Sequence, residues 1–246
     1  MNEFERRRAI QQLLARIDTA PGRRSAGVLP TGFAALDAAL GIGGFARGAI
    51  TEIFGPASCG KTALVLQAIA HQQIEGATAA WIDAEHAFDA AFAAHLGVDV
   101  ARLPVTTPDS AEEALDMTRR LASSGAVDLI AIDSVAALVP RLELETGLAA
   151  SGLQSRMLST ELRRLSQNAK RTGTAIVLLN QTRFRPGGEP ETSTGGVSVK
   201  LYTAVRIALS AQGRRVRVRV VKNNLAAAFL EAHLEWRREG GFIEAR

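Results

Sequence analysis

The amino-acid sequence predicts an α/β fold, in which helices flank a mostly parallel, twisted sheet that carries an antiparallel hairpin at its edge. Three observations lead to this prediction. Strand and helix patterns alternate along the chain from Val28 onward. The first four strand candidates are continuous apolar runs, which is typical of strands that are covered on both faces. The last two alternate apolar with polar or basic residues, as in Arg215-Val216-Arg217-Val218, which indicates a hairpin with one solvent-exposed face.

Each expected element has its own signal in the sequence. Residues 3–17 are expected to form an amphipathic helix, because aliphatic residues recur there at helical spacing, and the polar residues 18–25 form a linker. Strands are expected at residues 49–54, 79–83, 128–133, 174–180, 204–210 and 215–221. Helices are expected at residues 61–75, 87–96, 110–123 and 153–171. Two irregular stretches, residues 140–152 and 182–198, are expected to be loops, and loops of this length are usually functional.

Composition and charge exclude some classes of protein. The single cysteine, Cys59, excludes an intramolecular disulfide, and no apolar run is long enough to span a bilayer. The first residues lack the apolar core of a signal peptide, so a cytoplasmic protein without a membrane partner is expected. Residues 47–150 carry 6 basic and 14 acidic side chains, whereas residues 151–222 carry 14 basic and 3 acidic ones. The basic segment indicates either a polyanion-binding face or an ordinary solvated surface.

The strongest motif lies between the first long strand candidate and the helix that follows it. It matches G-x-x-x-x-G-K-[ST] over Gly55, Pro56, Ala57, Ser58, Cys59, Gly60, Lys61 and Thr62. In such a P-loop the glycines let backbone N–H groups point at phosphate oxygens, and the helix N-terminus adds positive potential. Lys61 is expected to reach the β- and γ-phosphates, and the Thr62 hydroxyl to ligate Mg²⁺. A nucleoside triphosphate and Mg²⁺ are therefore the expected ligands.

Two other strand candidates lead into carboxylates. Asp133 ends the apolar strand at 128–133, where a carboxylate is a natural outer ligand for the magnesium of a P-loop protein. Glu85 follows the strand at 79–83 and is the candidate that orients the attacking water. Asp83 ends that apolar run and is expected to point into the structure instead. These positions predict an ATPase.

The motifs together, in this order, resemble the RecA family of bacterial recombinases. The resemblance covers about residues 26–235 and extends beyond the P-loop and its carboxylates. The further segments that carry it are Leu36-Asp37-Ala38-Ala39-Leu40-Gly41, Asn180-Gln181-x-Arg183, Thr194-Gly195-Gly196, Lys200-x-Tyr202 and Val220-Val221-Lys222-Asn223. The resemblance implies a RecA-type P-loop NTPase core over residues 26–246, preceded by the helix and linker of residues 1–25 and lacking the family's C-terminal domain.

The resemblance also implies partners and residue roles. Family members stack into helical filaments on single-stranded DNA, with ATP between subunits. By this likeness Glu85 is the general base, Gln181 senses the γ-phosphate, and Lys222 reaches the γ-phosphate of a neighbour. Asp89 and Phe92 flank the adenine. The implied DNA contacts are Arg156, Ser159, Arg163, Arg183, Arg185, Gly195 and Gly196. Arginine side chains and glycine N–H groups both bind phosphates well, in agreement with the basic character of this segment.

The sequence departs from the family pattern at positions that serve assembly and DNA pairing. Residues 186–188 are Pro-Gly-Gly where an apolar wedge normally inserts between bases, in a loop that is shorter than usual. Asn224 replaces the second of two lysines that reach the neighbouring subunit, and Leu201 replaces an aromatic residue. The linker at residues 18–25 is short for the strand by which subunits normally join. Each departure weakens strand exchange or cooperative hydrolysis and leaves nucleotide binding untouched.

Two functions remain open at this stage. The first is a RecA-like ATPase that binds single-stranded DNA as an accessory in DNA repair, recombination or the SOS damage response. Its partners would be a RecA filament or translesion synthesis proteins, as for the ImuA-like accessory proteins. The alternative is a reduced but active strand-exchange recombinase that self-associates into ATP-dependent filaments.

Overall fold

The computed structural model describes residues 27–147, 152–183 and 192–245. The amphipathic helix expected at residues 3–17, its linker, Arg185 and residues 186–188 lie outside the described residues. In the described parts, no helix combines the length and apolar character that crossing a membrane requires.

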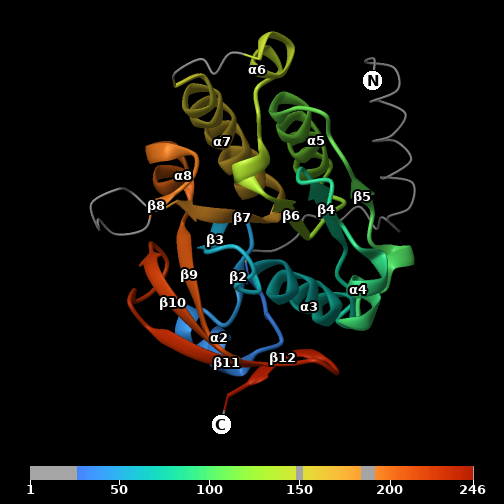
Figure 1. Ribbon diagram of the computed structural model, residues 1–246, viewed down its shortest axis with the longest axis vertical. Helices are drawn as coiled ribbons and strands as arrows, with labels where there is room; N and C mark the ends of the chain where they lie inside the picture. The colour runs from blue at the N-terminus through green and yellow to red at the C-terminus, as the bar shows by residue number, and fades with distance from the viewer. Residues whose placement is uncertain (1–26, 148–151, 184–191, 246) are drawn as a thin grey trace.

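A ten-stranded sheet runs through the centre of the described chain (Figure 1). Five neighbouring strands are parallel, as the continuous apolar runs predict. In spatial order they are β3 (Ile50–Gly55), β7 (Ala175–Arg183), β6 (Leu129–Asp133), β4 (Ala79–Asp83) and β5 (Val105–Thr106). Their order along the chain differs from their order in the sheet, as in a doubly wound α/β fold. Ligands of such folds bind at the carboxyl ends of the strands.

On the other side of β3, the sheet becomes antiparallel after one further parallel strand. β9 (Val205–Gln212) pairs in parallel with β3, and β10 (Arg215–Asn223) then pairs antiparallel with β9, which confirms the predicted hairpin. The alternation on β10 has the expected result, because Val216 and Val218 are buried while Arg217 is exposed. Two strands that we did not expect, β11 (Glu231–Arg237) and β12 (Gly241–Glu244), extend this edge.

Helices bury both faces of the parallel strands. On one face lie α2 (Ala34–Leu40), α3 (Lys61–Ile74) and α4 (Ala90–His95). On the other lie α5 (Ala111–Ser124), α7 (Leu153–Thr172) and α8 (Gly196–Tyr202) (Figure 1). Successive strand residues therefore enter different cores: Trp81 packs in the α3 core and Ile82 in the α5 core. Both faces must be apolar for this arrangement, which explains why the runs are continuous.

Several short elements complete the fold. β1 (Val28–Leu29) and β2 (Phe45–Ala46) form a separate two-stranded sheet, and two 3-10 helices are η1 (Val100–Arg102) and η2 (Val135–Ala137). α6 (Arg141–Thr146) lies within the irregular stretch expected at 140–152.

The predicted loop range of residues 182–198 extends too far at both ends. β7 continues to Arg183, β8 (Thr192–Ser193) pairs with it, and α8 begins at Gly196. α8 forms because Val199 is fully buried in the α5 core, which stabilises a helix that its glycine-rich start conceals.

Candidate active site

The sheet register aligns the candidate residues at one edge. Gly55 at the end of β3 lies opposite Gln181 on β7, and Asp83 at the end of β4 lies opposite Asp133 on β6. The carboxyl ends of four parallel strands therefore bring the P-loop, two carboxylates and an amide together. Residues far apart in the sequence become neighbours through strand pairing alone.

The P-loop connects β3 to α3 through a turn that requires glycine. Gly60 precedes the first helical residue with a φ of 92°, a left-handed conformation that side chains disfavour. A methyl group at Gly55 would lie 2.4 Å from the carbonyl oxygen of Leu209, and one at Gly60 would lie 2.3 Å from Cζ of Phe242. Both glycines thus let neighbouring segments approach the loop closely. The loop ends on the N-terminus of a 14-residue helix, which suits phosphate.

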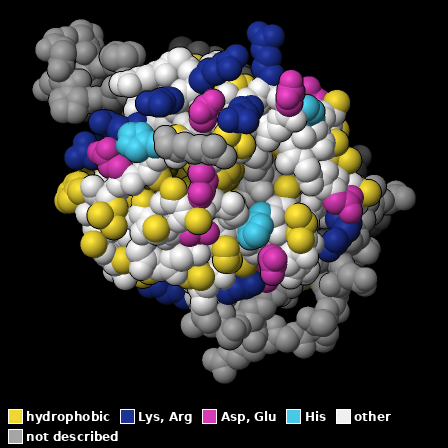
Figure 2. All heavy atoms as spheres, turned by 90° about the horizontal axis from the view of Figure 1, so that it is seen from below, with side chains coloured by type: hydrophobic (Ala, Val, Ile, Leu, Met, Phe, Trp, Pro, Cys, Tyr) yellow, Lys and Arg dark blue, Asp and Glu magenta, His cyan; other side chains and the backbone are white. Residues whose placement is uncertain are grey.

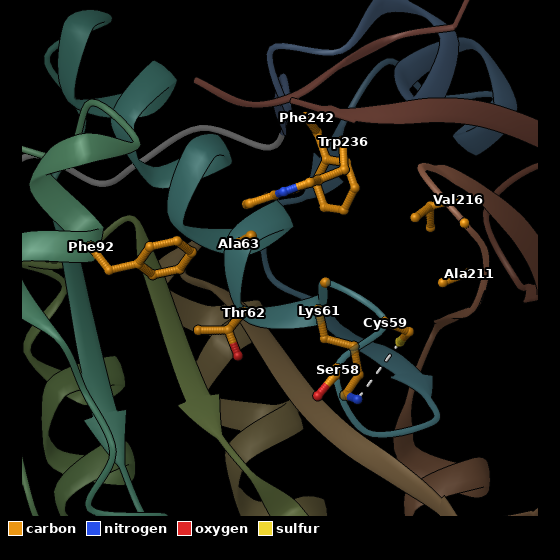
Figure 3. A pocket seen from close by; sticks show the side chains of 12 residues that line it. Ser58, Cys59, Lys61, Thr62, Ala63, Phe92, Ala211, Val216, Trp236 and Phe242 are labelled. Atoms are coloured by element: carbon orange, nitrogen blue, oxygen red, sulfur yellow. Dashed lines mark hydrogen bonds between the residues drawn. The ribbon is translucent and has the colours of Figure 1, made fainter. Parts of the chain in front are cut away.

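Lys61 places its ammonium group inside this loop. The residue, drawn with its neighbour Cys59 in Figure 3, is buried. Its Nζ donates to the carbonyl oxygens of Gly55 (3.1 Å) and Pro56 (2.7 Å). Nζ also lies 3.8 Å from Sγ of Cys59. Burial raises the pKa of the Cys59 thiol, an effect that the nearby Lys61 charge opposes. The thiol is therefore held neutral, consistent with a packing role for Cys59.

Thr62 and Asp133 form the predicted metal-binding pair. The Thr62 hydroxyl donates to Oδ2 of Asp133 at 2.8 Å. Burial raises the pKa of Asp133 to about 6, and the nearby Glu85 and Asp83 carboxylates add to the effect, whereas the Thr62 hydrogen bond and Lys61 oppose it. Within the described residues, no cluster of three His, Cys, Asp or Glu side chains could hold a metal. One hydroxyl and one carboxylate fit Mg²⁺, which takes few protein ligands and completes its shell with phosphates and water.

Glu85 joins three strand ends through hydrogen bonds. Its Oε1 accepts from the hydroxyl of Ser134 and from Nε2 of Gln181 at 2.9 Å. Its backbone N–H donates to the carbonyl oxygen of Asp133 at 3.1 Å. Asp83 instead turns inward, where it accepts from the backbone N–H groups of residues 87 and 88, as expected from the sequence. Of the two carboxylates after the apolar run of β4, Glu85 therefore contacts the neighbouring strand ends and Asp83 does not.

A cavity of about 340 Å³ opens beside the P-loop (Figure 3). Phe92, Trp236 and Phe242 form its aromatic wall opposite the loop residues. The rings of Trp236 and Phe242 meet edge to face with centroids 5.1 Å apart, and those of Phe92 and Trp236 lie 6.4 Å apart. An apolar, aromatic cavity next to a phosphate-binding loop suits a nucleobase.

Asp89 shapes this cavity without lining it. Its Oδ1 accepts from the backbone N–H groups of Ala91 (2.8 Å) and Phe92 (3.0 Å), so the carboxylate caps α4. The cap fixes the start of the helix that carries Phe92.

Lys222 lies away from the P-loop of its own chain. On the sheet it is opposite Arg206, which is opposite Glu52, three residues before the P-loop begins. Its Nζ donates to the carbonyl oxygens of Lys200 (2.7 Å) and Thr203 (2.6 Å) at the C-terminal end of α8. Burial and the nearby Arg206 charge lower the pKa of Lys222, and Glu52 opposes this. The structure does not bring Lys222 together with the other candidates.

The candidate nucleic-acid residues gather where α7 and α8 begin. Arg156 and Arg163 are exposed on α7, and Ser159 lies between them. Gly195 and Gly196, at the start of α8, both have left-handed φ angles, and a methyl group at Gly196 would lie 3.0 Å from Oγ of the α7 residue Ser155. Arg183 ends β7. The α7 side chains and the α8 backbone groups share one region, and Arg185 lies outside the described residues.

Residues 12–242 match the family described as RecA N-terminal domain. The chain belongs to the RecA family. It is 42% identical to Protein RecA of Acidothermus cellulolyticus over 98% of this chain and 79% of that protein. It is 47% identical to Protein RecA 1 of Myxococcus xanthus over 85% of this chain and 65% of that protein. The structure of the RadB recombinase covers 89% of this chain and 100% of its own, with a TM-score of 0.71. At 21% identity, that likeness establishes the fold alone.

Membership of the RecA family confirms the resemblance and the fold class expected from the sequence. Two residues of the site escaped prediction. Trp236 and Phe242 line the cavity from β11 and β12, the strands that we did not expect. The sequence offered one signal for them. Aromatic residues make up only 5% of this RecA-family chain, so each one is a candidate for contact with a base.

Proposed function

We propose that this RecA-family chain binds and hydrolyses ATP with Mg²⁺ and acts on single-stranded DNA in repair, recombination or damage tolerance, as an accessory or regulator. One observation carries the proposal. Glu85, hydrogen-bonded to Ser134 and Gln181, lies beside a P-loop whose Thr62 contacts Asp133. This arrangement brings a carboxylate, an amide and a hydroxyl–carboxylate pair to one sheet edge, which supports the proposed base, sensor and metal site.

The phosphate-binding groups have distinct tasks. P-loop N–H groups and the N-terminus of α3 bind the phosphate oxygens, and Lys61 exchanges its carbonyl partners for the β- and γ-phosphates. Thr62 and Asp133 hold Mg²⁺, which when bound neutralises negative charge on the phosphates. The aromatic wall of Phe92, Trp236 and Phe242 holds the base.

Glu85 is suited to orient the attacking water. The Ser134 hydroxyl and the Gln181 amide both donate to Oε1, so we assign the water to Oε2. Two donors on one oxygen fix the orientation of the carboxylate, as general-base catalysis requires. Because Gln181 touches the base directly, a movement of its amide toward the γ-phosphate would change the position of Glu85 as well.

The proposal of DNA contacts is based on the charge and exposure of arginine side chains. Arg156 and Arg163 project from α7 near the glycine N–H groups of α8, which allows binding through phosphates with little sequence preference. A second basic surface follows β10, where Arg215 and Arg217 are exposed. Figure 2 looks onto the end of the molecule where β11 and β12 lie, and it shows basic side chains interspersed with acidic ones. Such a mixed surface favours the α7–α8 region as the main site.

The accessory role is supported by what faces a neighbouring subunit. Lys222 is held by the carbonyl groups of its own α8, and Asn224 is exposed but neutral. The γ-phosphate bound by a neighbouring subunit would therefore meet little positive charge from this chain. We propose a RecA filament or translesion synthesis proteins as partners.

An active recombinase is the second candidate. It is favoured by the complete set of Lys61, Thr62, Glu85 and Asp133 and by the 98% of this chain that aligns with a Protein RecA. Lys222 lies level with Glu52 in the middle of β3 and makes no contact with the P-loop of its own chain, which suits a role at a neighbour's site.

The test is ATP turnover with and without single-stranded DNA, together with electron microscopy and a strand-exchange assay. We expect slow turnover that DNA stimulates, and short filaments or none. Lys61→Ala should abolish tight ATP binding, because it removes the cation that clamps the phosphates. Long ATP-dependent filaments with robust strand exchange would replace the accessory role by the recombinase role, and absence of ATP binding by the wild type would refute both.

A further inference from the structure

Glu52 is a buried carboxylate that the proposed chemistry does not use. It lies on β3, three residues before the P-loop begins, and its side chain is fully buried. Burial of a carboxylate is costly unless hydrogen bonds and an opposite charge compensate it. Oε1 accepts from Nδ2 of Asn180 at 2.8 Å, and Oε2 accepts from Nε of Arg206. One side chain thus connects β3 to the strands on both of its sides.

Each partner of Glu52 also binds a second segment. Nδ2 of Asn180 donates to the carbonyl oxygen of Thr194 at 2.8 Å, and Nη2 of Arg206 donates to Oγ of Ser193 at 3.0 Å. Both contacts reach the short segment of residues 193 and 194, at the end of β8 and just before α8. Glu52 therefore holds that segment twice, through an amide and through a guanidinium group.

The same network fixes the backbone of Gln181. Oδ1 of Asn180 accepts from the N–H group of Gln181 at 2.9 Å, and the carbonyl oxygen of Gln181 accepts from the N–H group of Thr194 at 3.2 Å. The side chain of Gln181 meanwhile reaches Glu85. A shift of Gln181 is therefore communicated to Thr194 as long as Asn180 keeps its position.

We propose that Glu52 is a positioning residue that couples the nucleotide site to the start of α8, by anchoring Asn180 and Arg206. The segment that it anchors leads directly into Gly195 and Gly196, the proposed nucleic-acid contacts. Nucleotide and DNA then bias the same hydrogen-bonded element, and each raises the affinity of the other by the same factor. This inference rests on the proposed function of the site.

A purely structural ion pair elsewhere in the sheet provides the matched control. Nη1 of Arg47 lies 2.6 Å from Oδ1 of Asp128, with side chains 17% and 8% exposed. The corresponding values for Arg206 and Glu52 are 12% and 0%. Asp128 precedes β6 at its amino end, away from the P-loop edge. Asp128→Asn therefore removes a comparable buried charge without touching the proposed coupling.

The experiment measures the affinity of a non-hydrolysable ATP analogue with Mg²⁺, with and without single-stranded DNA. The ratio of the two affinities is the coupling factor, which we expect to be at least about fivefold in the wild type. Glu52→Gln keeps the shape of the side chain but replaces one accepting oxygen with a donating NH2 group and removes the charge that holds Arg206. We expect its coupling factor to fall below about twofold, with the DNA-free affinity for the analogue nearly unchanged. Asp128→Asn should keep the wild-type factor.

Two milder variants keep the proposal testable if Glu52→Gln does not fold. Ser193→Ala removes only the outer contact of Arg206, and Arg206→Lys keeps the charge but loses the two-pronged geometry. Both should lower the coupling factor while leaving DNA-free ATP binding intact.

The outcomes separate this proposal from the proposed function. A wild-type coupling factor in Glu52→Gln and in both milder variants, with a loss of melting temperature like that of Asp128→Asn, would overturn the role of Glu52. Wild-type binding of both ligands without coupling would also overturn it and leave the proposed function in place. Absence of analogue binding by the wild type would refute the proposed function, and this inference with it.

Discussion

The nucleotide edge of the sheet and the basic α7–α8 region are built on different principles. At the nucleotide edge, strand register brings together Lys61, Asp133, Glu85 and Gln181 at adjacent strand ends. Their polar groups form hydrogen bonds within the chain. In the basic region the two arginine side chains of α7, Arg156 and Arg163, are exposed. Lys222 beyond it is bound to its own backbone. The proposed chemistry of ATP thus uses groups of one chain, whereas the proposed response to DNA and to neighbours depends on surfaces that another molecule must complete.

The largest expected effect tests the internal region. Glu85→Gln keeps the size of the side chain and its contact with the Ser134 hydroxyl but removes the base. The turnover number should fall by about 10²- to 10⁴-fold while the affinity for ATP is retained. Steady-state hydrolysis and equilibrium ATP binding measure the two quantities. Glu145→Gln, an exposed carboxylate on α6, is the control, and wild-type turnover in Glu85→Gln would show that another group is the base.

The raised pKa of Asp133 means that the charged carboxylate, the form proposed to bind the metal, destabilises the metal-free folded state in a pH-dependent way. Because the pKa is raised from 3.8 to about 6, the folded state binds the proton more tightly than the unfolded chain. The stabilising contribution is fully present below pH 3.8 and is lost as the pH rises through about 6. At pH 7 without metal, Asp133→Asn should therefore be more stable than the wild type by at most about 3 kcal/mol.

Thermal denaturation between pH 4 and pH 7 in the presence of a chelator measures this effect. The stability difference between Asp133→Asn and the wild type should grow with pH across about pH 4 to 6. Adding Mg²⁺ and ATP should stabilise the wild type and have much less effect on Asp133→Asn, because the carboxylate is the proposed metal ligand. A difference that is constant over the pH range would contradict the burial argument.

A positive charge introduced at position 224 tests whether turnover depends on contact with a neighbouring subunit. Asn224 is exposed, and its backbone N–H donates to the carbonyl oxygen of Ala204 at 2.9 Å, so a lysine fits there without disturbing the fold. Asn224→Lys should raise DNA-stimulated turnover by roughly tenfold if subunits stack with the γ-phosphate facing this position. Asn224→Gln is the uncharged control. Equal turnover in both variants would exclude that stacking geometry and favour the accessory role.

The smallest expected effect concerns phosphate contacts in the basic region. Each phosphate neutralised on single-stranded DNA contributes about −0.7 to the slope of log affinity against log salt. Removing Arg156 and Arg163 together should therefore flatten the slope by about 1.4. Arg119 and Arg120, which pair with Asp116 on α5, provide a double-alanine control. A slope unchanged by the α7 pair would move the DNA site elsewhere on the molecule.

The parts that were predictable share a local signal. The strand at 79–83 was predicted with its observed bounds, because an apolar run buried on both faces is visible without tertiary information. Asp133 and Glu85 followed from their place after such runs, since parallel register decides where strand ends meet. Their contacts with Thr62, Ser134 and Gln181 agree with that reasoning.

The parts that escaped prediction depend on distant partners. α8 begins with two glycines that suggest a loop, and only the burial of Val199 shows why it is helical. The contacts of Lys222 with the carbonyl groups of Lys200 and Thr203 could not be predicted either, because they form only once α8 ends beside β10. Trp236 lies on a short strand with polar alternation, which is a weak signal when the pairing strand is unknown.

The strand β12 has a consequence for how the protein acquires its ligand. Gln67 of α3 binds the backbone N–H and C=O groups of Phe242, 175 positions later in the chain, and the ring of Phe242 approaches Gly60. The cavity wall therefore exists only after the chain has closed a very long loop, which is a slow, late event in folding. The proposed nucleotide would then bind only molecules that have closed that loop, and by mass action it would stabilise them.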